Sequence, residues 1–423
     1  MAFSRRASTR AAASSRRAVV VGGSIAGLFA ALLLRRRGWA VQVFERSGEA
    51  LSGRGAGIVT HPQLDAVLEA AGVRRLSDLG IDVVRRVVLG RDGSVVAEHR
   101  CAQAMTSWDR LWRLLRDAVP DDLYVSGAEF AGLEQDGDGV RARFADGRVV
   151  AAEVLVGADG LRSAVRGAIS GEVTPVYAGY VAWRGLVDEA AMPEGARFEE
   201  FAFCLPPGEQ MLGYPVAGRE HDLRPGHRRY NWVWYRPAEA GRALADLLTD
   251  GRGRTHAVSI PPPLIRPELV EAMRADARAL LAPVFGAVVA ATAMPFLQPI
   301  YDLEAPALAA GRVALVGDAA FVARPHVGAG TTKAAEDALA LADALADALA
   351  DALADALGGG GTVEAGLRVY ESVRRPAGER IIRRARHLGA YMQSGARTEE
   401  EQRAAARHHG PAAVLAETAV LSF

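Results

Sequence analysis

The first clear pattern along the chain is an apolar run that is broken by glycines. Residues 18–21 are alanine and valine only, which is typical of a parallel strand buried on both faces. Residues 25–37 have the composition of a buried helix, and Gly38 ends it. A second strand-like segment at residues 40–44 completes a β-α-β unit of the expected length. The pattern predicts a dinucleotide-type fold that starts at Ala18.

Two further buried strands are predicted far along the chain, at residues 154–158 and 313–317. Other segments alternate between apolar and polar positions, and their turn residues predict hairpins over 83–100 and 140–150. Aromatic-rich strands over 177–235 are separated by proline and glycine, which favours antiparallel pairing. We therefore expect an α/β fold, in which a Rossmann-like domain with a parallel sheet is interrupted by an antiparallel-sheet domain.

Helical periodicity is clearest over residues 61–72 and in a long helix that begins near Thr332. Within the long helix, residues 342–357 are four copies of Ala-Asp-Ala-Leu, and the glycines at 358–361 end it. The leucines recur at every fourth position and so form a stripe about 120° wide. Such a stripe suits packing on the body of the protein or contact with a second copy. A coiled coil is less favoured, because its repeat would be seven.

Composition narrows the function classes. The chain has 423 residues, half of them hydrophobic and 24% charged, which suits two domains or one large elaborated domain. Fifty basic residues balance fifty acidic ones, so no bulk positive field favours nucleic acid or a membrane surface as partner. Two cysteines, Cys101 and Cys204, cannot form a disulfide framework or a zinc site. A cytoplasmic protein without a structural metal is expected.

The N-terminal segment needs a separate interpretation. Residues 1–17 contain five arginines and no acidic residue, and the apolar run follows directly. A signal peptide or a short membrane span could have this pattern, but glycines break the run where a strand would turn into a helix. We expect residues 1–17 to be a frayed extension. A transit peptide is the alternative, because arginine and serine without acids are its signature too.

The first group of residues with a chemical signature is the glycine-rich turn at residues 22–27, Gly-Gly-Ser-Ile-Ala-Gly. Gly22 permits a tight turn, and Gly27 lets the helix pack close to the strand, so that the helix N-terminus faces a pyrophosphate. Ser24 occupies the usual middle-glycine position and is small enough for close backbone approach. Glu45 lies at the end of the next strand, where a carboxylate can accept ribose hydroxyls.

Two more groups also follow buried strands. Asp159 begins the segment Asp-Gly-Leu-Arg-Ser-Ala-Val-Arg over residues 159–166, and it could simply cap the following helix. Asp318 ends the third strand and precedes Arg-Pro-His-Val-Gly-Ala-Gly at residues 324–330. Each signal alone is moderate, but three strand-end sites in this order are not a coincidence.

These motifs resemble the single-component FAD-dependent aromatic hydroxylases of the para-hydroxybenzoate hydroxylase type. The resemblance covers residues 18 to 390 and implies non-covalent FAD, with NAD(P)H as a transient co-substrate. It implies that FAD is reduced, that dioxygen adds to give a flavin hydroperoxide, and that its distal oxygen attacks an electron-rich ring. The residues that the resemblance assigns to cofactor binding are Gly22, Ser24, Ile25, Ala26, Gly27, Glu45, Arg46, Gly57, Asp159, Asp318, Pro325, Gly328, Ala329 and Gly330.

The resemblance also implies a substrate site beside the flavin. His326 and Pro325 are the catalytic candidates, and Trp183, Tyr214 and His326 are the substrate-contacting ones. Most aromatic residues of the predicted sheet are expected to pack in its core, and one or two of them to form a wall of an aromatic pocket. Histidine titrates in a useful pH range, but His326 could equally well hydrogen bond its own loop. The expected substrate is a small electron-rich aromatic, hydroxypyridine-like rather than a benzoate. Arg184 is the only arginine near these segments that could face a carboxylate, and we expect it to be structural.

The chain departs from the family at two places. The segment 328–332 reads Gly-Ala-Gly-Thr-Thr, so the family's glutamine and asparagine contacts are missing. Trp108 stands where the family has an arginine, and Arg110 lies two places on. Two other interpretations therefore stay open: a flavoprotein that acts as a reductase or epoxidase, and a flavin-binding module without turnover.

The resemblance finally implies a domain division and a homodimer. The domains are expected as an N-terminal extension at 1–17, FAD-binding parts at 18–72, 101–172 and 301–390, substrate-domain parts at 73–100 and 173–300, and a C-terminal segment at 391–423.

Overall fold

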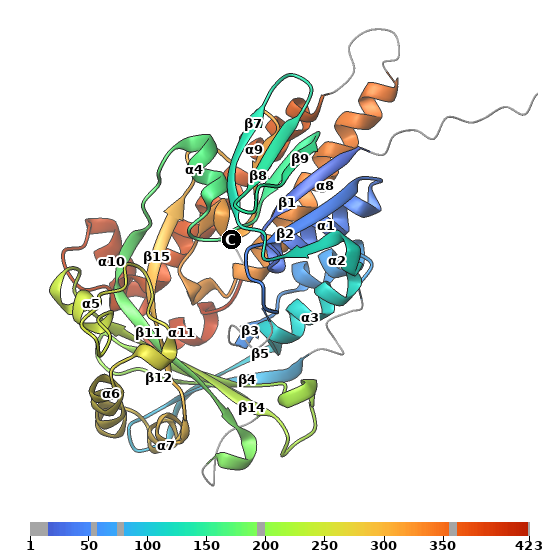
Figure 1. Cartoon of the computed structure of the whole chain (residues 1–423). Helices are drawn as coiled ribbons and strands as arrows, with labels where there is room; N and C mark the ends of the chain where they lie inside the picture. The colour runs from blue at the N-terminus through green and yellow to red at the C-terminus, as the bar shows by residue number, and fades with distance from the viewer. Residues whose placement is uncertain (1–15, 52–56, 74–79, 193–198, 355–361, 422–423) are drawn as a thin grey trace, which may run out of the picture.

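The computed structural model describes residues 16–51, 57–73, 80–192, 199–354 and 362–421. In this part of the chain two large sheets meet, one largely parallel and one largely antiparallel (Figure 1). The predicted fold class is confirmed. The frayed extension expected at residues 1–17 lies outside the described residues except for its last two, and strand β1 already includes Arg17.

The six-stranded sheet brings together the three buried strands that the sequence predicted in separate places. Its order is β16-β17-β10-β1-β2-β6, and every pair except β16–β17 is parallel. Parallel strands end at the same edge, so the motifs that follow β1, β10 and β17 become neighbours. The strands are β1 (Arg17–Val21), β2 (Ala40–Glu45), β6 (Tyr124–Ser126), β10 (Val154–Gly157), β16 (Ala309–Ala310) and β17 (Val313–Leu315).

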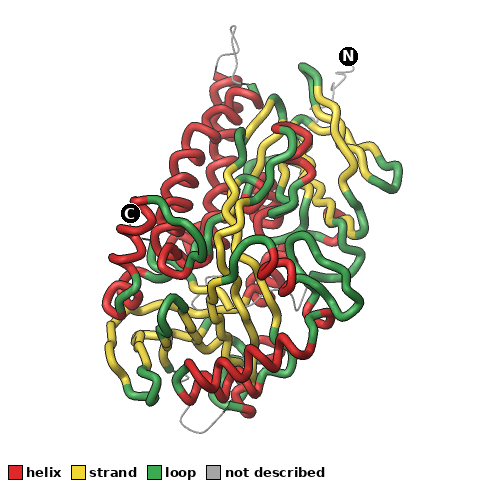
Figure 2. Tube along the Cα trace, turned by 90° about the vertical axis from the view of Figure 1, so that its left-hand side faces the viewer, coloured by secondary structure: helices red, strands yellow, loops and turns green. Residues whose placement is uncertain are grey.

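Helices and a small sheet cover the two faces of this sheet. Long helices lie along one face and the three-stranded sheet β7-β8-β9 along the other (Figures 1 and 2). Helix α8 packs against α1, α2 and α9, which builds a continuous apolar core. The elements are α1 (Ile25–Arg36), α2 (Pro62–Ala70), α3 (Trp108–Ala118), α4 (Ala164–Ser170), α8 (Gly330–Ala354), α9 (Val363–Gly389), β7 (Phe130–Gln135), β8 (Val140–Phe144) and β9 (Val149–Ala152).

The repeat within α8 packs on the body of the protein where its side chains are described. Leu345, the first leucine of the stripe, is fully buried in the core that α1 and α9 share with it. The side chains of Leu349, Leu353 and Leu357 lie outside the described residues. The start of the leucine stripe is therefore packed within the chain.

The nine-stranded sheet has the order β18-β15-β11-β14-β13-β12-β4-β5-β3. Both predicted hairpins are confirmed, as β4–β5 here and as β8–β9 in the small sheet. The strands over 176–237 pair antiparallel, but β12 also lies parallel to β4. The strands are β3 (Gly57–Val59), β4 (Ile81–Leu89), β5 (Val95–Ser107), β11 (Val176–Asp188), β12 (Glu200–Cys204), β13 (Gln210–Val216), β14 (Arg229–Pro237), β15 (Phe296–Glu304) and β18 (Phe321–Val322).

One face of this sheet packs on helices α6 (Pro267–Leu280) and α7 (Pro283–Ala291). The other face packs on α10 (Glu399–His408) and α11 (Pro411–Glu417), so the C-terminal segment belongs to this side of the molecule. Short helix α5 (Arg242–Leu247) lies in the connection after β14. The expected domain division differs from the observed sheets at three places. Strand β3 lies within the expected FAD-binding part 18–72 but joins the second sheet. Strands β5 and β15 run across the expected limits at residues 100 and 300.

Candidate active site

Two cavities lie side by side between the sheets. The first, of about 540 Å³, follows the carboxyl edge of the parallel sheet. The second, of about 410 Å³, lies between that edge and the antiparallel sheet. The two cavities share Arg184, Asp318, Gly330 and Thr331, so together they form one extended site.

The glycine-rich turn is shaped by close backbone contacts at the floor of the first cavity. Gly22 has a φ of +109°, and a Cβ there would overlap the Ala158 carbonyl of the neighbouring strand. A Cβ on Gly27 would overlap the Gly22 carbonyl, and one on Gly23 would overlap the Tyr124 hydroxyl. The turn therefore requires glycine at positions 22 and 27, whereas a side chain at position 23 would require the Tyr124 ring to move. This agrees with the roles expected for Gly22 and Gly27.

The N-terminus of α1 opens into the first cavity. Ser24 precedes the helix, its side chain makes no capping hydrogen bond, and no acidic residue lies in the first turn. The first backbone N–H groups and the positive end of the helix dipole are thus available to an anion. Glu45 is fixed beside them, because its carboxylate accepts hydrogen bonds from the Gly23 and Ser47 N–H groups at 2.8 and 2.9 Å.

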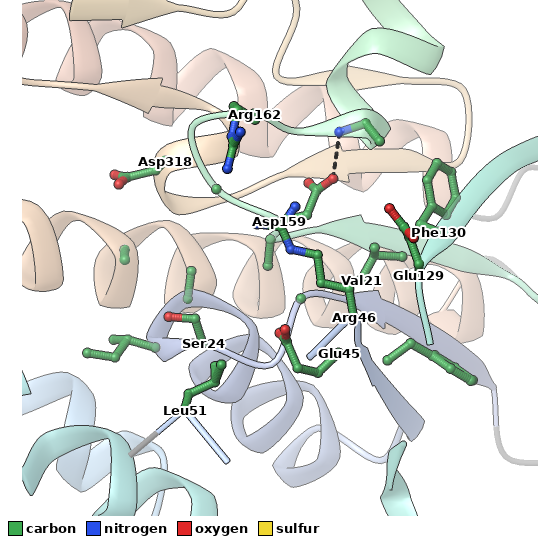
Figure 3. Close-up of a pocket in the computed structure, with 18 of the residues that line it drawn as sticks. Val21, Ser24, Glu45, Arg46, Leu51, Glu129, Phe130, Asp159, Arg162 and Asp318 are labelled. Atoms are coloured by element: carbon green, nitrogen blue, oxygen red, sulfur yellow. Dashed lines mark hydrogen bonds between the residues drawn. The ribbon is translucent and has the colours of Figure 1, made fainter. Parts of the chain in front are cut away.

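The opposite wall is formed by the segment after β10 (Figure 3). Asp159 caps α4: its carboxylate accepts from the Ser163 hydroxyl at 2.5 Å and from the Ala164 N–H at 2.7 Å. Burial raises the pKa of Asp159, while these hydrogen bonds oppose the shift. Arg162 is exposed to the cavity across from Ser24 and Glu45, and Arg46 lies between the two sides. Two cations therefore line the first cavity near the glycine-rich turn.

An ion pair between a buried lysine and an exposed aspartate marks the junction of the two cavities. Lys333 in the first turn of α8 is 1% exposed, and its Nζ lies 3.1 Å from Asp318 Oδ1. The same ammonium donates to the Phe321 carbonyl at 2.6 Å. Sequence reasoning gave Lys333 no role, although a signal existed: it is the only lysine among the 50 basic residues.

The second cavity has mainly apolar and aromatic walls. Aliphatic side chains from β3, β13, β14 and β15 line it, together with Tyr214 and Tyr235. Trp183 was expected here, but the structure places it in the opposite core with Trp232 and Trp234. Successive residues of a strand point to opposite faces, so Arg184 reaches the cavities and Trp183 does not.

His326 lines the second cavity but does not titrate where the sequence suggested. It is 2% exposed, and burial, together with the charge of Arg324, lowers its pKa to about 3. His326 is thus neutral at physiological pH. Its Nε2 lies 2.7 Å from the Tyr180 hydroxyl on β11, so its partner is not its own loop.

The remaining predicted residues divide between the two cavities. Arg110, the substitute considered for the family arginine, instead donates to the His221 carbonyl at 2.5 Å, while Trp108 lines the first cavity. Gly27 lines neither cavity. The first cavity is lined by Gly22, Ser24, Ile25, Ala26, Glu45, Arg46, Asp159, Asp318 and Gly330, and the second by Gly57, Tyr214, Asp318, Pro325, His326, Gly328, Ala329 and Gly330.

The C-terminal segment also reaches the second cavity, which the sequence did not indicate. Thr418 and Ala419 line it, and the Ala419 N–H donates to the His326 carbonyl at 2.7 Å. Arg86, fully buried on β4, donates to the Leu415 and Thr418 carbonyls at 2.8 and 2.7 Å. These bonds hold the end of α11 against the cavity.

Comparison with known proteins decides what this site holds. A family model described as FAD binding domain matches residues 16–204 and 299–385, and one described as FAD binding domain-like matches 177–302. The chain belongs to the FAD-binding domain family. It is a flavoprotein monooxygenase of the para-hydroxybenzoate hydroxylase type, as its motifs predicted.

The individual proteins that match this chain are also named as monooxygenases. The chain is 34% identical to 2,6-dihydroxypyridine 3-monooxygenase of Paenarthrobacter nicotinovorans over 326 residues, which are 75% of this chain and 80% of the relative. It is 31% identical to 3-amino-4-hydroxybenzoate 2-monooxygenase of Streptomyces cremeus, with 86% and 84% covered. The structure of 2,6-dihydroxypyridine-3-hydroxylase from Arthrobacter nicotinovorans superposes with a TM-score of 0.79 at 30% identity, covering 91% and 95%.

The residues present fit FAD. The helix N-terminus of α1 suits a pyrophosphate, and Glu45 and Asp318 offer carboxylate acceptors at two ends of the first cavity. The buried Thr331 hydroxyl at the start of α8 has no hydrogen-bond partner and lines both cavities. Across the described ranges, His, Cys, Asp and Glu do not gather in a group of three that could bind a metal. None of the helices in the described ranges is long and apolar enough to cross a membrane.

Gly22→Val tests the turn. A β-branched side chain at φ +109° costs about 1–3 kcal/mol of strain and also overlaps the Ala158 carbonyl, so FAD content should fall at least about tenfold. Flavin absorbance of the purified protein measures this. Gly137→Val is the control, because no atom lies within 4 Å of its Cβ position. Full flavin content in Gly22→Val would contradict the assignment.

Lys333→Met tests the ion pair between buried Lys333 and Asp318. Loss of the ammonium leaves Asp318 and the Phe321 carbonyl without their donor, so we expect FAD affinity to fall about tenfold. Lys333→Arg should not restore it, since a larger planar guanidinium replaces a fully buried ammonium. Fluorescence titration of FAD into apoprotein measures both. Arg403→Met, which removes an exposed ion pair with Glu399, is the control, and equal affinities would refute the role.

Acid should destabilise the protein through two buried histidines. Burial lowers the pKa of His61 to about 4 and that of His326 to about 3, whereas unfolded histidine titrates near 6.5. Below pH 6.5 the unfolded state therefore binds protons that the folded state does not. From pH 7 to 5 the free energy of unfolding should fall by roughly 4 kcal/mol for both together.

Urea unfolding at the two pH values measures this loss. His61→Gln should remove about half of the decrease that the two histidines produce. His99→Gln, at an exposed position, should leave the decrease unchanged. The same pH dependence in His61→Gln and the wild type would contradict the assignment.

Proposed function

We propose that this monooxygenase hydroxylates a small, electron-rich N-heteroaromatic ring of the hydroxypyridine type in its second cavity. The observation that carries the proposal is the lining of that cavity, which has about 410 Å³ and mainly aliphatic and aromatic walls. Relatives named for 2,6-dihydroxypyridine and 6-hydroxynicotinate support a pyridine ring.

The places of the cofactor-binding residues around the first cavity support the roles that we propose for them. Ser24 and the α1 N-terminus would bind the pyrophosphate, Glu45 the adenosine ribose, and Asp318 the ribityl chain. Residues 325–330 would lie along the isoalloxazine ring. When bound, FAD supplies dioxygen activation with electrons from NAD(P)H, so that one oxygen atom enters the substrate ring and the other leaves as water.

The charges at the cavity favour a deprotonated substrate. Arg184, Arg324 and Lys333 line the second cavity against one carboxylate, Asp318, and an excess of nearby cations lowers the pKa of a ring hydroxyl. A deprotonated hydroxyl donates electron density to the ring carbon that is attacked. Because its pKa is about 3, His326 would serve as a neutral hydrogen-bonding group and not as a base near pH 7.

A carboxylated aromatic is the second candidate substrate class. Arg184 donates to Gln298 at 2.8 Å through one nitrogen, and its buried Nε has no partner. A substrate carboxylate could use that nitrogen, and a relative is named for 3-amino-4-hydroxybenzoate. We favour the hydroxypyridine class, because Gln298 already fixes the guanidinium.

Three further properties are part of the proposal. NAD(P)H would bind transiently, because the described residues contain one parallel sheet with one glycine-rich turn of the dinucleotide type. Family resemblance supports a homodimer, although Leu345 packs within the chain. The low cysteine content supports a cytoplasmic location.

An oxidation assay tests the proposal. Addition of 2,6-dihydroxypyridine should accelerate NADH or NADPH oxidation strongly, with little hydrogen peroxide formed. Acceleration by 3-amino-4-hydroxybenzoate alone, lost in Arg184→Ala, would favour the carboxylated class. If the protein is yellow but no hydroxylated ring accelerates NADH or NADPH oxidation, the proposal is contradicted and a non-catalytic flavin module is favoured. Oxidation of NADH or NADPH without formation of an oxygenated product would favour a reductase.

A further inference from the structure

One buried nitrogen of His326, a residue that lines the second cavity, has no hydrogen-bond partner. Nε2 lies 2.7 Å from the Tyr180 hydroxyl, but the buried Nδ1 has no hydrogen-bond partner. A buried polar atom without a partner costs about 1–3 kcal/mol, so such atoms are rare and need an explanation.

The packing of the ring shows which way Nδ1 points. A Cβ built on Gly389 of α9 would lie 2.9 Å from Cδ2 of His326 and 3.1 Å from Nε2. Nδ1 is the ring atom opposite that edge, so it points away from α9. The Tyr235 ring packs edge-on against His326, with 4.6 Å between the centroids, and His326 is one of the residues that line the second cavity.

The surroundings of Tyr180 decide which nitrogen of His326 carries the proton. Tyr180 is fully buried, and burial raises its pKa well above the usual value, so its hydroxyl stays protonated. The Arg324 guanidinium beside the ring is a donor only, and Asp302 holds it through a 3.0 Å ion pair. The Tyr180 hydroxyl therefore donates to His326 Nε2, and the single proton of the neutral imidazole sits on Nδ1.

We propose that Tyr180 fixes His326 in the tautomer that carries its proton on Nδ1, and that this N–H donates a hydrogen bond to an oxygen of the substrate ring. Tyr180 is then a positioning residue, and His326 contacts the substrate. The substrate class in this inference rests on the function proposed above. A ring with an oxo, hydroxyl or anionic oxygen at that position is favoured over one with an amino group, which would place two donors together.

Nitrogen-15 spectra of histidine in the holoenzyme test the tautomer without reference to activity. The His326 signals, identified by their loss in His326→Asn, should show a proton on Nδ1 and none on Nε2. Tyr180→Phe should move part of the proton to Nε2 and raise the histidine pKa. Tyr177→Phe is the control, since it removes a hydroxyl of the same strand that bonds the Ala238 carbonyl at 3.0 Å. A proton on Nε2 in the wild type would overturn the inference.

Substrate binding tests whether the His326 Nδ1–H group donates a hydrogen bond to the substrate. An asparagine side chain can place an N–H near Nδ1, whereas a glutamine side chain reaches Nε2. Titration of 2,6-dihydroxypyridine, followed by flavin absorbance, should give a dissociation constant within about threefold of the wild type for His326→Asn, and about tenfold weaker binding for His326→Gln and Tyr180→Phe. Equal binding in wild type and Tyr180→Phe, or in the two histidine variants, would overturn the inference.

Failure of the proposed substrate class and failure of the proposed tautomer give different results. If the wild-type protein binds no hydroxypyridine, the proposed substrate class is wrong, and the spectra still decide the tautomer. If the wild type binds and hydroxylates 2,6-dihydroxypyridine but its His326 carries the proton on Nε2, the proposed function stands and the role of Tyr180 is wrong.

Discussion

Close approach of backbone segments at the carboxyl edge of the parallel sheet is the constraint on which the structure depends. The turn after β1 lies directly against the strand end of β10, where a Cβ on Gly22 would overlap the Ala158 carbonyl. Because the segments meet without side chains between them, the N-terminus of α1 is exposed to the first cavity. The same edge carries Asp318 after β17, so strands far apart in the sequence supply one ligand site.

The second cavity depends on this edge for only one of its walls. The antiparallel sheet provides another through Tyr214 and Tyr235, and the end of the C-terminal segment provides a third through Thr418 and Ala419. Two charged residues, Arg184 and Asp318, line both cavities, and Asp318 pairs with Lys333. A ring bound in the second cavity would meet apolar walls, neutral His326 and cations at its border.

The sequence predicted what local patterns encode. The strand–turn–helix at residues 17–36, both hairpins and the buried strands are set by hydrophobic spacing and glycines, and the structure has all of them. Trp183 was misplaced because the face of a strand depends on register, which a composition argument does not fix. The shifted pKa of His326 comes from burial by distant segments, and the Arg86 bonds to Leu415 and Thr418 join residues more than 300 positions apart.

The most direct test of the account is oxygen incorporation. Wild-type holoenzyme is incubated with 2,6-dihydroxypyridine, NADH or NADPH and ¹⁸O₂, and the product is analysed by mass spectrometry. The account predicts a ring-hydroxylated product that carries one ¹⁸O atom for each nicotinamide cofactor oxidised. A product whose added oxygen comes from water, or cofactor oxidation that yields only hydrogen peroxide with every hydroxylated heteroaromatic and benzoate offered, would contradict it.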